Sequence, residues 1–265
     1  MPSVKICPGM IVPLTRLGSI VLRGIVVILL AADALAAEPH CPAVGLVHLE
    51  LPVTRAAISR NRPITVVALG SSSTEGAGAS APDRTYPARL DALLHMSWPG
   101  AAVTIRNKGV GGQTVDAVMA RLDADVLAEK PTLVIWQVGT NEALRGMDPA
   151  YFEARLDEGL RRIAAIGSDV ILMDYQIAPR MPAQEKRAEY RAIIAKEAAA
   201  HGVSLFSRAD LMRAWLAIDP GASDMIGPDG LHQSDRGYAC LAASLDSAIV
   251  AATAPRIAAV KVNLK

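Results

Sequence analysis

The chain has 265 residues, of which 51% are hydrophobic, and it carries a formal net charge of +1. This length suits one domain with a sizeable core. The near-neutral charge and the aromatic content of only 4% argue against a nucleic-acid-binding surface, which is basic and rich in aromatic side chains, so we expect no nucleic-acid partner.

Residues 1–37 have the pattern of an export signal. Basic residues precede the apolar run 25–30, and the small residues 34–37 follow it as a cleavage pattern. We expect this segment to be removed and the mature chain to be periplasmic or secreted. The apolar run is too short to span a bilayer, so stable membrane insertion is not expected after cleavage; an uncleaved anchor is the alternative.

Two cysteines, Cys41 and Cys240, follow the predicted signal peptide. In an exported chain they could join in a disulfide that ties an N-terminal arm, residues 38–62, to the last helix. Two separate buried thiols are the alternative. The sequence has no Cys/His cluster at zinc spacing, so we predict no metal site, and no pattern in it sets the oligomeric state.

After the arm, strands and helices alternate through residues 63–254, and residues 255–265 form a C-terminal tail. The predicted strands cover residues 66–69, 102–106, 133–138, 170–173 and 203–206. The predicted helices cover residues 86–98, 115–126, 149–166, 185–200 and 235–249. Alternation of this kind predicts an α/β fold, a three-layer α/β/α sandwich around a five-stranded parallel sheet in the flavodoxin-like order 2-1-3-4-5.

The first strand breaks into glycine and hydroxyl residues from Gly70 onward. Ligands bind at this carboxyl edge in open α/β sheets, and a serine on a tight turn there exposes its hydroxyl, so Ser72 is the candidate nucleophile. A flexible linker would not continue a buried strand. A phosphate loop would require a lysine that the stretch lacks, and the stretch does not match the Gly-x-Ser-x-Gly elbow of α/β-hydrolases.

Polar or glycine-rich segments also follow the second and third strands, at Gly109 to Gly112 and at Asn141. They should share one edge of the sheet with Ser72. The base that the serine needs is His232, with Asp229 as its partner. An acid and an imidazole three residues apart on a turn can face the same side. Asp229 would then accept from Nδ1–H of His232 and leave Nε2 free to take the serine proton.

These four segments resemble, in order, the four blocks of the SGNH hydrolases, the GDSL-type esterases and lipases. The matching blocks are Gly70-Ser71-Ser72, Asn107-x-Gly109-x-x-Gly112, Gly139-Thr140-Asn141-Glu142 and Asp229-x-x-His232. The resemblance implies the SGNH hydrolase fold and a serine esterase that needs no cofactor. It also implies a triad of Ser72, His232 and Asp229, with an oxyanion hole formed by the N–H groups of Ser72 and Gly112 and by the Asn141 amide.

Two positions depart from the family pattern, because Ser71 and Glu142 stand where aspartates are usual. Neither position is the nucleophile, the base or an oxyanion donor, so the mechanism should survive. Met147, Met181 and Met225 fall in loops expected near the site, where they either form an adaptable apolar wall for an acyl chain or fill gaps in the core.

The leading hypothesis is an exported serine hydrolase that cleaves carboxylic esters of small to medium acyl groups, on O-acetyl sugars or acyl lipids, through an acyl-serine intermediate. A lysophospholipase or acyl-thioesterase is an alternative within the same chemistry. A second enzyme hypothesis is a glycan O-acyltransferase. The hypothesis without enzyme activity is an inactive glycan- or lipid-binding module.

Overall fold

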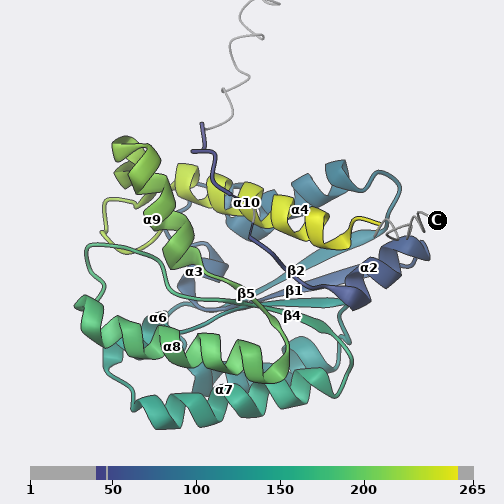
Figure 1. Ribbon diagram of the computed structural model, residues 1–265, viewed down its shortest axis with the longest axis horizontal. Coiled ribbons are helices and arrows are strands. Elements are labelled where there is room, and N and C mark those ends of the chain that lie inside the picture. The colour runs from purple at the N-terminus through teal and green to yellow at the C-terminus, as the bar shows by residue number, and fades with distance from the viewer. Residues whose placement is uncertain (1–39, 46, 256–265) are drawn as a thin grey trace, which may run out of the picture. The chain divides into compact units, whose positions relative to one another are not determined.

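A parallel five-stranded sheet in the order β2-β1-β3-β4-β5 organises the molecule (Figure 1). The computed structural model describes residues 40–45 and 47–255. The strands are β1 (Ile64–Gly70), β2 (Val103–Gly109), β3 (Leu133–Gln137), β4 (Asp169–Met173) and β5 (Ser204–Phe206). The predicted fold class and strand order are therefore confirmed. The predicted signal peptide and nearly all of the predicted tail lie outside the described residues.

Helices cover both faces of this sheet, as Figure 1 shows. One face carries α2 (Pro52–Ser59), α4 (Tyr86–Ser97), α9 (Arg208–Ile218) and α10 (Asp235–Thr253). The opposite face carries α5 (Val115–Leu122), α7 (Pro149–Ala164) and α8 (Gln184–His201). Shorter segments complete the chain: α3 (Ser72–Glu75), η1 (Pro82–Arg84), η2 (Asp123–Leu127), α6 (Thr140–Arg145) and η3 (Pro220–Met225).

The side chains of strands β1 and β3 explain why helices must pack on both faces of the sheet. Successive side chains of a strand point to opposite faces, so Val66 packs into one apolar cluster and Val67 into the other. Ile135 and Trp136 of β3 divide in the same way. Apolar residues at every position are typical of central parallel strands, and all five residues of β3 are buried.

Several helix ends follow from local chemistry that the sequence shows. The Asp148 side chain caps α7 by accepting from the Tyr151 N–H, and Pro149 occupies the first turn. Ser234 caps α10 by accepting from the Gly237 N–H. Gly202 ends α8 in the left-handed conformation. These ends lie within a residue or two of their predicted positions.

Helices α2, α3, α6 and α9 were not among the predicted elements, and two of them, α2 and α9, have two or more turns. Helix α2 lies within the predicted arm, where Pro52 fits its first turn. Helix α9 follows β5 and is capped by Ser207, and its buried Leu211, Met212 and Trp215 have helical spacing. That spacing is a signal that could have predicted α9. No helix in the described part of the chain is long and apolar enough to span a membrane.

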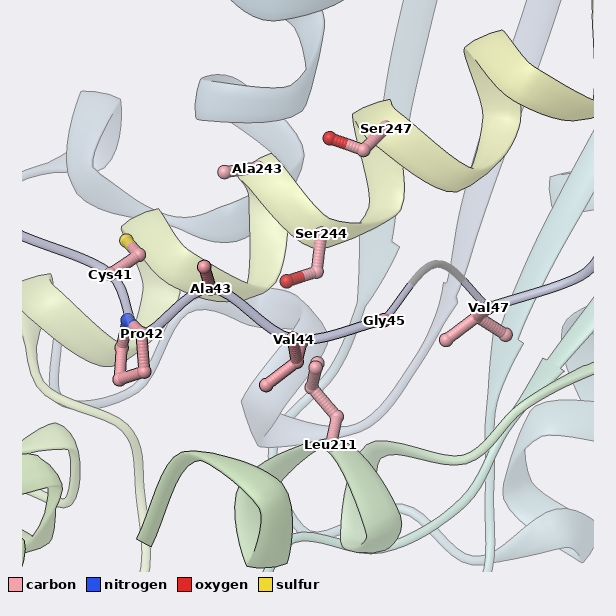
Figure 2. A pocket seen from close by; sticks show the side chains of 10 residues that line it. All are labelled: Cys41, Pro42, Ala43, Val44, Gly45, Val47, Leu211, Ala243, Ser244 and Ser247. Carbon is pink, nitrogen blue, oxygen red and sulfur yellow. The ribbon is translucent and has the colours of Figure 1, made fainter. Parts of the chain in front are cut away.

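A disulfide joins Cys41 to Cys240 of α10, with 5.3 Å between the two Cα atoms. Of the two arrangements left open by the sequence, the structure has the bonded one. Beyond Cys41 the chain runs between α10 and α9, where the side chains of Val44 and Leu211 point toward each other (Figure 2). The predicted arm is thus packed against the body.

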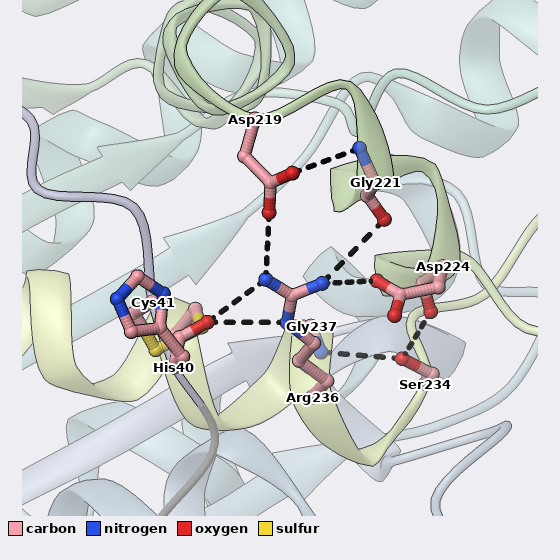
Figure 3. Close-up of a disulfide and its surroundings, with 9 residues drawn as sticks. His40, Cys41, Asp219, Gly221, Asp224, Ser234, Arg236 and Gly237 are labelled. Atoms are coloured by element: carbon pink, nitrogen blue, oxygen red, sulfur yellow. Dashed lines mark hydrogen bonds and ion pairs between the residues drawn. A yellow bond between two sulfur atoms is a disulfide. The ribbon is translucent and has the colours of Figure 1, made fainter.

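Arg236 adds a second tie next to the disulfide (Figure 3). Its guanidinium donates to the His40 carbonyl at 2.9 Å, to Asp219 at 2.9 Å and to Asp224 at 2.7 Å. Asp219 and Asp224 belong to the segment that leads to Asp229. The start of the described chain, α10 and this segment are therefore held together around one cation.

Removing the disulfide should destabilise the protein. In the chain-entropy model, closing so long a loop restricts the unfolded chain and contributes up to about 5 kcal/mol. The double variant Cys41→Ser/Cys240→Ser should therefore unfold at lower urea concentration than the wild type. Dithiothreitol should lower the wild-type midpoint and leave that of the double variant unchanged; equal midpoints for both chains under oxidising conditions would contradict the prediction.

Candidate active site

The residues predicted to act together lie at the carboxyl edge of the sheet. Ser72 opens the one-turn helix α3, directly after β1. Gly112 lies in the turn after β2, and Asn141 lies in the first turn of α6, after β3. Asp229 and His232 lie in the loop before α10. The first three segments meet because parallel strands deliver their connections to the same edge. The loop before α10 joins them there through the contact of His232 with Ser72.

A chain of hydrogen bonds links three of these side chains. His232 Nε2 lies 2.8 Å from Ser72 Oγ, and His232 Nδ1 lies 2.5 Å from Asp229 Oδ2. The other Asp229 oxygen accepts from the backbone N–H groups of Leu231 and His232, at 2.9 and 3.0 Å. The carboxylate therefore fixes both the backbone and the ring of His232, and the ring faces the serine hydroxyl.

Asp229 is held in its charged form. Burial opposes the charge, but the N–H donors of Leu231 and His232 and the adjacent imidazole outweigh it and lower the pKa of Asp229 to about 2. A carboxylate that stays ionised can hold the imidazole orientation and stabilise the imidazolium formed when His232 takes a proton.

This low pKa predicts how stability depends on pH. Because the folded pKa of about 2 lies below the ordinary value of 3.8, ionised Asp229 stabilises the fold above pH 4, and this contribution is lost as the pH falls toward 2. Urea unfolding of the wild type and of Asp229→Asn at several pH values measures it. The wild-type advantage should be constant from pH 7 to pH 5 and shrink below pH 4; an advantage that grows on acidification would contradict the assignment.

Gly109, at the end of β2, lets α3 approach the sheet. A Cβ at this position would lie 2.0 Å from the backbone nitrogen of Glu75 and 2.4 Å from the Thr74 carbonyl carbon. The Asn107 side chain fixes this end of β2, since its Oδ1 accepts from the Gly109 N–H at 2.9 Å. The glycine of the second block therefore has a packing reason: it sets the spacing between β2 and the helix that carries Ser72.

Gly109→Ala is expected to destabilise the fold by about 1–3 kcal/mol or more and to lower any Ser72-dependent activity, because backbone atoms of α3 must move. Gly111→Ala is the matched control. Its Cβ would meet only the Glu75 carboxylate, at 2.8 Å, and that side chain can rotate away. Urea unfolding of both variants tests the difference, and equal midpoints would contradict it.

The predicted oxyanion donors lie side by side. Asn141 Nδ2 donates to the carbonyl of Gln113, the residue after Gly112, at 2.7 Å. Arg145 of α6 donates to the Gly112 carbonyl at 2.6 Å. Gly112 has a φ of +73°, in the left-handed region that favours glycine. These contacts, one from each end of α6, hold the turn after β2 against that helix.

The two departures from the family pattern have structural partners. Buried Glu142 accepts from the Val115 N–H at 2.6 Å and from the Gly139 N–H at 2.9 Å, so it ties the starts of α5 and α6 together. Burial raises the pKa of Glu142, although these two donors oppose the rise. Ser71 donates through its N–H and its hydroxyl to Gln137 Oε1, both at 3.0 Å.

A buried polar chain runs beneath the site. Gln137 donates to Thr140 Oγ1 at 3.3 Å, and the Thr140 hydroxyl donates to Gln176 Oε1 at 3.1 Å. Gln176 Nε2 donates in turn to the carbonyl of Leu231, the residue before His232, at 3.1 Å. With the Ser71 bonds, this chain connects the loops of the serine, the asparagine and the histidine.

Arg208 of α9 supports this chain from within the core. It is fully buried and donates to Gln176 Oε1 at 2.8 Å and to the Asp174 carbonyl at 3.1 Å. Burial lowers the pKa of Arg208 and raises the pKa of Asp174, while their mutual attraction opposes both shifts. Sequence reasoning missed Gln176 and Arg208, because nothing local marks a polar residue that will be buried.

One cluster of possible ligand atoms lies elsewhere, on α7 and α8. Asp157, Glu197 and His201 bring their ligand atoms within 4.8 Å of one another. The Asp157 carboxylate is already paired, at 2.9 Å, with His201 and with Arg161. This cluster was not predicted from the sequence, and the absence of a metal site stays a prediction made from the sequence alone.

Comparison with known proteins identifies the family of this chain. The model of the non-GDSL lipase-like family matches residues 40–255. Esterase TesA of Pseudomonas aeruginosa is 31% identical over 129 residues, which are 48% of this chain and 59% of the relative. The acetylxylan esterase of Geobacillus stearothermophilus is 33% identical over 93 residues, 34% of this chain and 42% of the relative. The chain thus spans about half the length of these curated relatives.

A solved structure matches over a longer stretch. The lipase/acylhydrolase from Enterococcus faecalis has a TM-score of 0.60 and 26% identity, covering 71% of this chain and 96% of its own. The family name also fits Ser71, which stands where the GDSL block has aspartate. The fold, the four ordered blocks and the match over residues 40–255 establish that this chain belongs to the non-GDSL lipase-like family, a relative of the SGNH and GDSL hydrolases.

Proposed function

We propose that the protein is a serine hydrolase that cleaves carboxylic esters of small to medium acyl groups through an acyl-serine intermediate. The observation that carries this proposal is the bonded chain from Ser72 Oγ through the His232 ring to Asp229, with contacts of 2.8 and 2.5 Å. The same three residue types in hydrogen-bond reach perform acyl transfer on unrelated folds.

In the first step, Ser72 Oγ attacks the ester carbonyl carbon while His232 Nε2 takes the hydroxyl proton. The imidazolium then gives this proton to the alcohol oxygen as the carbon–oxygen bond breaks, and the acyl group stays on Ser72. In the second step, water attacks the acyl-serine, again losing a proton to His232. The imidazolium returns this proton to Ser72 Oγ as the bond between Oγ and the acyl carbon breaks, which releases the acid and restores the Ser72 hydroxyl.

The negative charge on the carbonyl oxygen needs donors fixed in advance. We assign these to the N–H groups of Ser72 and Gly112 and to the Asn141 amide. The assignment is supported by the contact of Asn141 with Gln113 at 2.7 Å and by the placement of Ser72 at the start of α3. Donors held in this way need no reorganisation as the charge develops.

Export of the protein is part of the proposal. It is supported by the pattern of residues 1–37 and by the Cys41–Cys240 disulfide, because disulfides persist in oxidising compartments and are rare in the cytosol. The full-length chain should therefore appear in the periplasmic or external fraction of its host, shortened near Ala36 or Ala37. Recovery of an uncleaved chain from the cytosol would overturn this part.

The experiment for activity uses a series of p-nitrophenyl esters and a fluorophosphonate probe, which labels activated serines. We expect turnover of the esters and labelling that is lost in Ser72→Ala. Absence of both with the folded wild-type chain would overturn the proposed function.

A further inference from the structure

A cavity of about 510 Å³ opens beside the loop that carries Asp229 and His232. Its walls come from the segment after β4, from the first turn of α8, from α9 and from η3 with the residue that follows it. Most of its lining is apolar and includes Ile177, Met181, Met212, Trp215, Leu216 and Ile226. This size and lining are those of pockets that bury an apolar ligand.

The wall of this cavity is continuous with the catalytic loop. Ile226 forms an antiparallel bridge with Gln233, the residue after His232, and the Gly227 N–H donates to the His232 carbonyl at 2.8 Å. On the β4 side, the Arg180 N–H donates to the Gly230 carbonyl at 2.9 Å. The cavity and the Ser72–His232 pair therefore flank the same loop.

Charge in the cavity is confined to one side chain. The guanidinium of Arg187 lies 5.8 Å from the centroid of the Tyr175 ring, in the position of a cation–π contact. Ser223 adds one hydroxyl, and the rest of the lining has no charged group. A hydrocarbon chain fits these walls better than a sugar, whose hydroxyls would lose water without gaining partners.

We propose that this cavity, the α9 pocket, binds the acyl chain of a medium-chain ester while the ester carbonyl lies at Ser72. This inference rests on the proposed function and names its substrate class. An acetyl group ends near Ser72 and gains nothing from the pocket. Each further methylene that reaches the pocket leaves water, which is worth about fourfold in kcat/KM.

Of the three methionines near the site, only Met181 lines the α9 pocket. Met225 is fully buried in the core, and Met147 packs against the other apolar cluster. Met181 therefore belongs to the predicted adaptable wall, whereas the other two fill gaps.

The test compares acetate and octanoate esters of p-nitrophenol on the full chain and two matched variants. Leu216→Asp places a charge in the pocket, and Ile218→Asp places the same charge on the same helix outside it. Both side chains are exposed, 38% and 57%, so neither change disturbs the core. Leu216→Asp should lower kcat/KM for octanoate by about tenfold or more and leave acetate unchanged, whereas Ile218→Asp should change neither.

Ser223→Trp is a second variant, which fills the pocket instead of charging it. It should produce the same selective loss on octanoate, mainly as a higher KM. An octanoate-to-acetate ratio that neither pocket variant changes, in a chain that hydrolyses both esters, overturns the pocket alone. No turnover of either ester by the wild-type chain overturns the proposed function together with the pocket.

Discussion

Ser72→Ala is expected to reduce kcat on p-nitrophenyl esters by about 10⁴-fold or more, to the residual rate that binding and oxyanion stabilisation supply. The variant should keep its stability, because Ser72 is half-buried and its Oγ is bonded to the His232 ring in the loop before α10. Fluorophosphonate labelling should be lost together with turnover.

Ser73→Ala provides the control for this loss. Ser73 is the next residue of α3 and is buried, and its hydroxyl has no part in the proposed mechanism. This variant should keep both turnover and labelling. If Ser72→Ala retained the wild-type rate, or if both variants lost activity equally, Ser72 would not be the nucleophile.

Asn141→Ala should reduce kcat by about 10²–10³-fold, the cost of removing one oxyanion donor. KM should change little, because the amide serves the charged intermediate and not the ground-state ester. Asn141→Asp keeps the shape of the side chain and replaces the donor with a negative charge, so it should be at least as impaired. Steady-state kinetics on one ester gives both constants.

Loss of the Asn141 amide also removes its bond to the Gln113 carbonyl, so stability needs a separate measurement. Urea unfolding of Asn141→Ala should lie within about 1.5 kcal/mol of the wild type, the typical value of one hydrogen bond. A fall in kcat that the loss of folded protein accounts for, or a rise in KM alone, would contradict the oxyanion role.

The arrangement of the sheet was predictable because two periodicities and a few end signals encode it. The near-continuous apolar run 133–138 indicated a central strand, and Asp148 with Pro149 indicated a helix start; both are confirmed. Helix α9 was missed although Ser207 and the spacing of Leu211 and Trp215 encode it.

For the site, the sequence indicated the catalytic residues but not the residues that support them. The four blocks in order singled out Ser72, Gly112, Asn141 and the Asp229/His232 pair, because catalysis demands particular residue types at strand ends. The buried polar residues that support these side chains could not be predicted from the sequence. Gln176 and Arg208 look like ordinary polar residues of a loop and a helix, and both are buried where α9 meets the segment after β4.

By itself, the amino-acid sequence determined the order of strands and helices and the residues that carry the chemistry, because these depend on neighbours a few positions apart. Tertiary structure decided what depends on distant segments meeting: the disulfide between Cys41 and Cys240, the polar chain from Ser71 to Leu231, and the α9 pocket. The free energy of burying a side chain or closing a loop depends on residues that are distant in the sequence and close in the fold. A local sequence pattern does not include those residues.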